Sequence, residues 1–130
     1  MTQKELKQYI DLSEKFEEEC NRVCRILSDS KKRHGECSDI SYAEKFKIEG
    51  DDSVWWEGDE YWSYGGHESH GGYFSADFLT MSDNELAEIV KKENEEWEAA
   101  QEKKKNEKAA EEKAKRMAKY EELKKEFENG

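Results

Sequence analysis

The apolar positions of residues 2–28 repeat at the spacing of an amphipathic helix. Seven positions follow one another at alternating steps of three and four residues: Leu6, Tyr9, Ser13, Phe16, Cys20, Val23 and Leu27. This spacing places them on one side of a helix. Thr2 and Glu5 form a capping-box pattern, which marks a helix start. We therefore expect a long N-terminal helix that packs on the core of the same chain or in a dimeric coiled coil.

After a polar connector at residues 29–39, the pattern becomes that of a short antiparallel meander. Tyr42, Phe46 and Ile48 share one face of a first strand of about seven residues, because side chains alternate between faces along a strand. The sequence Glu-Gly-Asp-Asp at residues 49–52 is typical of a turn. Residues 54–57 then predict a second strand.

The continuation of the meander is predicted from its glycines. Gly58-Asp59 is a turn signal, and residues 60–64 predict a third strand. Residues 65–72 have a glycine pair at each end, which favours a flexible loop that contains His67 and His70. Tyr73-Phe74 resumes the sheet as a fourth strand, so the meander has three or four strands.

A second capping box, Ser82 with Glu85, precedes a second helical pattern. Its first turns have apolar residues at helical spacing, and we expect them to pack on the sheet: Leu86, Ile89, Val90 and Trp97. Residues 101–113 lose the apolar side, which is typical of an exposed helix. Apolar positions return near the end, at Met117, Tyr120, Leu123 and Phe127.

The predicted fold is therefore α+β: a long N-terminal helix, an antiparallel β-meander and a long, partly solvent-exposed C-terminal helix. We expect one domain at residues 1–100 and an exposed, charged helical extension at 101–130. The two helices have more apolar stripe than such a sheet can cover, which favours a homodimer.

The charge of the chain is concentrated in its middle. The net charge is −11, and residues 36–82 contribute −9 of it, from eleven acidic and two basic residues. The same segment holds ten of the fifteen aromatic residues, whereas disordered acidic segments are poor in aromatics. An acidic chain of this kind disfavours direct binding of nucleic acid or an anionic membrane and favours a basic partner.

The compartment is expected to be the cytoplasm of a bacterial cell. No run of about 18 apolar residues is present, and residues 1–5 lack the features of a secretory signal. The three cysteines are an odd number, which suits reduced thiols better than a disulfide framework.

The acidic and aromatic side chains of the meander predict a partner-binding surface. Trp and Tyr dominate binding hot spots, and a row of carboxylates resembles the phosphates of a nucleic acid. The predicted partner-binding residues are Glu49, Asp51, Asp52, Trp55, Glu57, Asp59, Glu60, Tyr61, Tyr64, His67 and His70. The alternative is that about half of the aromatics form the core and that the acids solvate its outer side.

Two residue sets could hold a metal ion. Cys20, Cys24, His34 and Cys37 are residue types that suit tetrahedral zinc, but the first two fall on or beside the apolar helix stripe, where thiols pack as core residues. His67 and His70 are the second set, and loop histidines between glycines are more often solvent-exposed. No catalytic signature or nucleotide-binding motif is present. We therefore expect no metal, no cofactor and no enzymatic activity.

The layout resembles that of small acidic accessory proteins encoded by bacteriophages and prophages. The resemblance is carried by residues 60–66, by residues 73–86 and by the Glu/Lys-rich helix that follows them. It implies a counter-defence role of the anti-CRISPR kind, in which the protein inhibits a host nucleic-acid-binding enzyme by occupying its basic groove. Two alternatives stay open: an oligomeric sponge that sequesters a nucleotide signal, and a purely structural oligomer.

Overall fold

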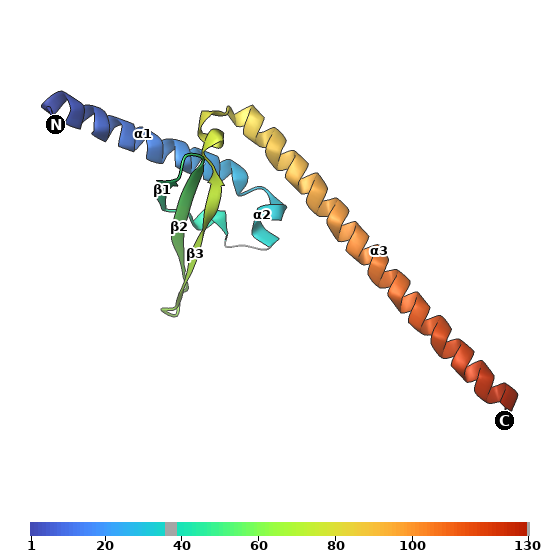
Figure 1. Cartoon of the computed structure of the whole chain (residues 1–130). Coiled ribbons are helices and arrows are strands. Elements are labelled where there is room, and N and C mark those ends of the chain that lie inside the picture. The colour runs from blue at the N-terminus through green and yellow to red at the C-terminus, as the bar shows by residue number, and fades with distance from the viewer. Residues whose placement is uncertain (36–38, 130) are drawn as a thin grey trace. The chain divides into compact units, whose positions relative to one another are not determined.

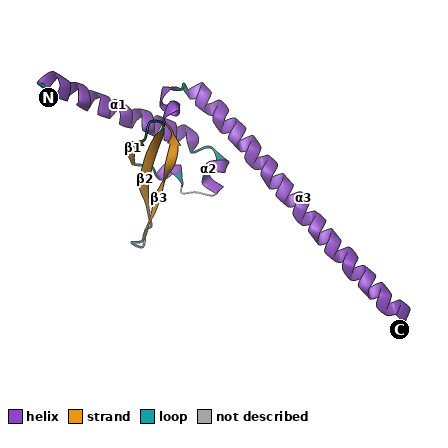
Figure 2. Ribbon diagram, in the orientation of Figure 1, coloured by secondary structure: helices purple, strands orange, loops and turns teal. Residues whose placement is uncertain are grey.

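The computed structural model describes residues 1–35 and 39–129, and it has the α+β architecture expected from the sequence (Figure 1). Its helices and strands are, in chain order, α1 (Gln3–Leu27), α2 (Lys31–Gly35), β1 (Lys45–Glu49), β2 (Ser53–Tyr61), β3 (His67–Ser75) and α3 (Asp83–Asn129). Two 3-10 turns, η1 (Ile40–Tyr42) and η2 (Ala76–Thr80), flank the sheet. The strands form one antiparallel sheet in the order β1-β2-β3 (Figure 2).

Both long helices begin at the capping boxes that the sequence predicts. The hydroxyl of Thr2 accepts a hydrogen bond from the amide of Glu5 at 3.1 Å, and the Glu5 carboxylate accepts one from the amide of Thr2 at 3.1 Å. The bond from the Thr2 amide favours the charged form of the Glu5 carboxylate and lowers the pKa of Glu5. At the start of α3, the hydroxyl of Ser82 accepts the amide of Glu85 at 3.2 Å.

The hydrophobic core lies between the second half of α1 and one face of the sheet. α1 contributes four buried side chains, the sheet three, η1 one and α3 two: Cys20, Val23, Cys24, Leu27, Val54, Trp56, Phe74, Ile40, Leu86 and Val90. Burial of one large apolar side chain stabilises a fold by about 1.5–3 kcal/mol. We call this covered side of the sheet the inner face.

The first half of α1 continues the apolar stripe beyond this core. Leu6, Tyr9, Ile10 and Leu12 are exposed, although their spacing matches that of the buried residues further along the helix. The sheet therefore covers only part of the stripe. The expectation that α1 is a core helix holds for its second half.

Polar contacts fix the first turns of α3 to the preceding elements. The Arg22 guanidinium donates to the carboxylate of Asp83 at 2.7 Å and to the backbone carbonyl of Met81 at 2.9 Å. Glu93 accepts hydrogen bonds from the buried hydroxyl of Ser30 at 2.8 Å and from Arg33 at 2.6 Å. These contacts satisfy polar groups that would be costly to bury alone.

The chain divides into two compact units, Met1–Asn94 and Glu95–Gly130. The sequence expectation placed the boundary at residue 100. Beyond Asn94, the large apolar side chains at Met117, Tyr120, Leu123 and Phe127 are all exposed. Among the described helices, none combines the length and the apolar character that crossing a bilayer requires.

The structure corrects the predicted strand boundaries. Tyr42 lies in η1 and not in the first strand, which begins at Lys45. Gly58-Asp59 is not a turn, because β2 runs without interruption from Ser53 to Tyr61. Gly58 lets β2 pack closely against the backbone of Tyr42, because a Cβ atom at this position would lie 1.7 Å from the Tyr42 carbonyl oxygen.

Residues 67–72 form the first part of β3 and not a flexible loop. Each of them has a partner on β2, with Gly58 opposite His70 and Glu60 opposite Glu68. The reversal of the chain occurs earlier, where the amide of Trp62 donates to the carbonyl of Gly66 at 2.9 Å and Gly65 has a φ of 88°. Glycine adopts this conformation without a steric penalty. The predicted third and fourth strands are therefore replaced by one long hairpin.

We expect the substitution Gly58→Ala to destabilise the protein by at least about 2 kcal/mol, because the added methyl group collides with a backbone atom that has no free space to move into. Gly71→Ala is a matched control on β3, where the nearest atom to the new Cβ is the Trp56 carbonyl oxygen at 3.4 Å. Urea unfolding followed by circular dichroism measures both. Equal loss of stability in the two variants would contradict the close approach at Gly58.

Candidate binding face

The side of the sheet opposite the core carries aromatic, acidic and other polar side chains. We call it the outer face, and its register positions are Lys45, Lys47, Glu49, Ser53, Trp55, Glu57, Asp59, Tyr61, His67, Ser69, Gly71, Tyr73 and Ser75. None of these residues is buried. Within the unit Met1–Asn94, the described helices pack on the inner face and leave this one accessible.

The aromatic residues of the outer face are arranged in cross-strand pairs. Trp55 is opposite Tyr73, and Tyr61 is opposite His67. The rings of Tyr61 and His67 stack with their centroids 5.9 Å apart. A hydrogen bond from the Tyr73 hydroxyl to the carboxylate of Glu49 raises the pKa of Tyr73, since the bond favours the protonated phenol. These pairs hold exposed rings in fixed positions.

The hairpin tip adds a second pair of rings. Trp62 and Tyr64 stack at 5.8 Å with an angle of 14° between their planes, and Tyr64 is 82% exposed. A Cβ atom on Gly66 would lie 2.6 Å from the Trp62 ring, so glycine is needed for the ring to lie against the turn. Tyr64 is one of the predicted partner-binding residues, and Trp62 is its stacking partner.

Acidic side chains are interleaved with these rings. Glu57 and Asp59 share the outer face, as their spacing predicts, and Asp59 accepts a hydrogen bond from Ser69 at 2.8 Å. Asp51 and Asp52 are exposed at the turn between β1 and β2. The row of negative charge is interrupted, because Lys45 lies 3.8 Å from the Glu57 carboxylate.

Glu60 and His70, both predicted to bind a partner, lie on the inner face. His70 is stacked on Tyr42 with ring centroids 5.0 Å apart, and its side chain is only 10% exposed. Its Nδ1 accepts a hydrogen bond from the amide of Asp39 at 3.1 Å, and its Nε2 lies 3.1 Å from the Glu60 carboxylate. The Nδ1 contact places the ring proton on Nε2, which donates to Glu60.

The same region brings three metal-ligand types together. Donor atoms of Glu60, Glu68 and His70 lie within 4.8 Å of one another. A metal ion would have to bind Nε2, but that nitrogen carries the ring proton as long as Nδ1 accepts from Asp39. Glu60 also accepts a hydrogen bond from the Tyr42 hydroxyl, which raises the pKa of Tyr42. The arrangement is that of a structural polar cluster that attaches η1 to the sheet.

The cysteine pattern does not assemble into a described site. Cys20 and Cys24 are buried in the core, and desolvation raises the pKa of each thiol to about 12. A neutral thiol among apolar side chains acts as a packing group. Cys37 lies outside the described residues, as does the side chain of His34.

Comparison with protein-family models, curated proteins and solved structures finds no match to this chain. The outer face is therefore interpreted from its own geometry.

The two histidines of β3 should differ sharply when each is replaced by alanine. His70→Ala removes two hydrogen bonds and a ring contact in a mostly buried position, so we expect a loss of about 1.5–3 kcal/mol in unfolding free energy. His67→Ala removes only an exposed stacking partner of Tyr61 and should cost less than about 0.7 kcal/mol. Chemical denaturation measures both, and equal costs would show that His70 is not part of the structural cluster.

Proposed function

We propose that this chain is a non-catalytic binding protein that docks its outer face against a basic surface of a nucleic-acid-binding protein. The observation that carries the proposal is the one-sided coverage of the sheet. Helices pack on the inner face, whereas the outer face keeps Trp55, Tyr61 and Tyr73 accessible among carboxylates. A face of this composition differs from an ordinary solvated sheet surface, on which large aromatic side chains are few.

The aromatic pairs supply the expected anchors of the contact. Tyr and Trp bury a large area at a low cost in conformational entropy, and their polar atoms can still find hydrogen-bond partners. Tyr61 and Tyr73 are already held in place by His67 and Glu49, so little further ordering is needed on binding.

The carboxylates supply the preference for a basic partner. Glu49, Glu57 and Asp59 lie on the outer face, and Asp51 and Asp52 extend the negative charge onto the adjoining turn. Lys45 and Lys47 lie on the edge strand β1, where lysine also discourages edge-to-edge pairing. Charges at the rim of an interface act mainly on the association rate, so in this proposal the acids guide the encounter and the rings hold the complex.

The proposed effect is inhibition of the partner, because a protein that occupies a nucleic-acid-binding groove blocks the nucleic acid. This is the counter-defence role implied by the resemblance to small phage-encoded proteins. The nucleotide-sponge alternative would bury its ligand among aromatic residues, with support from a flexible loop at residues 65–72. It loses that support, since His67–Ser75 is a strand.

The test begins with capture of a partner from bacterial lysate on the immobilised protein, with and without excess duplex DNA. We expect DNA to compete with capture, because both bind the same basic groove. With the captured protein purified, biolayer interferometry then compares two variants. Tyr61→Ser with Tyr73→Ser should speed dissociation by about ten- to a hundredfold. Glu49→Gln with Glu57→Gln and Asp59→Asn should slow association several-fold at low salt and less at physiological salt.

A matched control removes the same charge elsewhere. Glu102→Gln with Glu111→Gln and Glu122→Gln lies on α3 and should change neither rate by more than about twofold. Capture that duplex DNA does not affect would contradict the proposed partner class. Wild-type kinetics of the tyrosine variant would contradict the outer face as the binding surface.

A further inference from the structure

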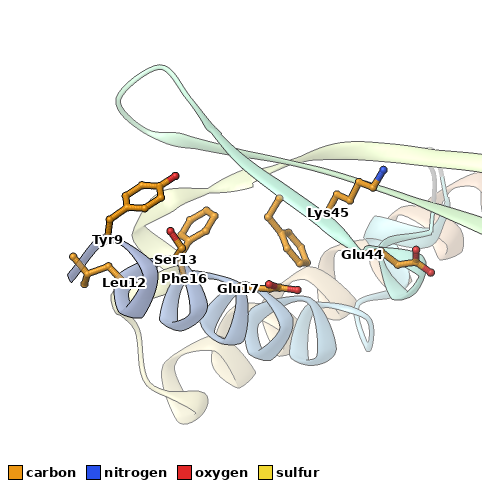
Figure 3. Close-up of a pocket in the computed structure, with 8 residues that line it drawn as sticks. Tyr9, Leu12, Ser13, Phe16, Glu17, Glu44 and Lys45 are labelled. Atoms are coloured by element: carbon orange, nitrogen blue, oxygen red, sulfur yellow. The ribbon is translucent and has the colours of Figure 1, made fainter. Parts of the chain in front are cut away.

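A groove runs between the first half of α1 and the beginning of β1. Its volume is about 530 Å³, and its apolar lining comes from Tyr9, Leu12 and Phe16 on α1 and from Phe46 on the strand side (Figure 3). Figure 3 shows the side chains of Tyr9 and Phe16 directed from α1 toward the strand. This groove is the part of the α1 stripe that the sheet leaves uncovered.

The groove lies in an acidic part of α1. Residues 11–19 contain five acids and one base, a net charge of −4. Glu17 lines the groove from the helix, and Glu44 and Lys45 line it from the beginning of β1, so its charged lining is acidic by one charge. A ligand for this groove should therefore combine apolar side chains with positive charge.

The last turns of α3 have this combination on one face. At about 100° per residue, Met117, Tyr120, Leu123 and Phe127 fall within one sector of the helix, and all four are exposed. Lys113, Arg116 and Lys124 fall in the same sector, and no Asp or Glu does. Residues 113–119 contain four bases and no acid, a net charge of +4 in a chain whose total is −11. We call this sector the basic apolar face of α3.

We propose that the groove between α1 and β1 binds the basic apolar face of α3 from a second copy of this chain. The two surfaces match in kind, since each offers exposed apolar side chains. Their charges are opposite in sign, because the groove lining holds Glu17 and Glu44 against Lys45, and the basic apolar face holds Lys113, Arg116 and Lys124 without an acid. The contact is independent of the proposed function of the outer face. If each copy inserts its α3 into the groove of the other, the contact is made twice and the assembly closes as a dimer.

The contact gives a physical reason for two features of the sequence. The apolar stripe of α1 has exposed residues from Leu6 to Leu12, about two turns outside the core. The apolar positions of α3 return after residues 101–113, which lack an apolar side. Exposed stripes of this length on one chain are typical of surfaces that another helix covers.

Sedimentation equilibrium of the full chain across about 1–100 μM tests the proposal. We expect the wild type to show the mass of two chains at the upper end. Lys113→Glu with Arg116→Glu reverses two charges on the basic apolar face and should weaken association by at least about tenfold. Lys115→Glu with Lys119→Glu makes the same change in net charge outside that face and should weaken it by less than about threefold.

A second pair of variants tests the groove itself. Tyr9→Glu places a charge in the groove and should weaken association about as much as the α3 variant, whereas Gln8→Glu, its neighbour outside the lining, should not. Circular dichroism confirms that each variant retains the wild-type helix content. Adding Glu17→Lys and Glu44→Lys to the charge-reversed α3 variant should restore association.

The possible outcomes separate this contact from others. A strictly monomeric wild type at 100 μM would overturn the proposal. The basic apolar face of α3 would then be free to bind another macromolecule. A dimer that neither Tyr9→Glu nor the α3 reversal weakens would place the interface elsewhere and would also overturn it. The proposal is supported if Tyr9→Glu and the α3 reversal both weaken association and if Glu17→Lys with Glu44→Lys restores association of the α3 variant.

Discussion

The packing of the second half of α1 on the inner face of the sheet is the interaction on which the rest of the structure depends. A three-stranded sheet with one apolar face gains stability when that face packs against a helix. Cys20, Val23 and Leu27 provide that surface for Val54 and Trp56. Because the core lies on one face of the sheet only, the opposite face carries side chains that a two-sided core would have buried.

The same contact explains why polar clusters surround the core. Around a small core, the ends of each helix and strand lie close to solvent. Hydrogen bonds and ion pairs then hold these ends in place. Glu93 on α3 binds Arg33 of α2 and Ser30, the residue before α2. His70 binds Asp39 and Glu60 between η1 and the sheet. Both clusters use charged or ionisable side chains in structural roles, so acidic residues in this chain are not all available to a partner.

The sequence predicted the helices well because their signals are local. A capping box satisfies backbone amides within one turn, and the 3-4 spacing of α1 depends on one face of one helix. The structure confirms both predicted helix starts, at Thr2 with Glu5 and at Ser82 with Glu85. Which half of α1 is buried could not be deduced in this way, since it depends on the length of a sheet formed by other residues.

The strands were predicted less well because glycine has two roles that look alike in a sequence. Gly58 was interpreted as a turn residue, but the constraint on it is the carbonyl of Tyr42, sixteen positions away in the chain. The glycine pairs around His67 and His70 likewise predicted a loop, although cross-strand pairing with β2 makes them part of a strand. Trp55, Glu57 and Asp59 share one face of β2, whereas Glu60 and His70 fall on the other face of the sheet.

Hydroxyl-radical footprinting of the protein alone and in complex with its captured partner tests the central claim most directly, because it reports the solvent access of individual side chains. We expect partner binding to protect Trp55, Tyr61 and Tyr73 from oxidation. The oxidation of Tyr9 and Tyr120 should stay unchanged between samples of equal oligomeric state. Unchanged oxidation of the outer-face rings, with protection elsewhere on the chain, would contradict it.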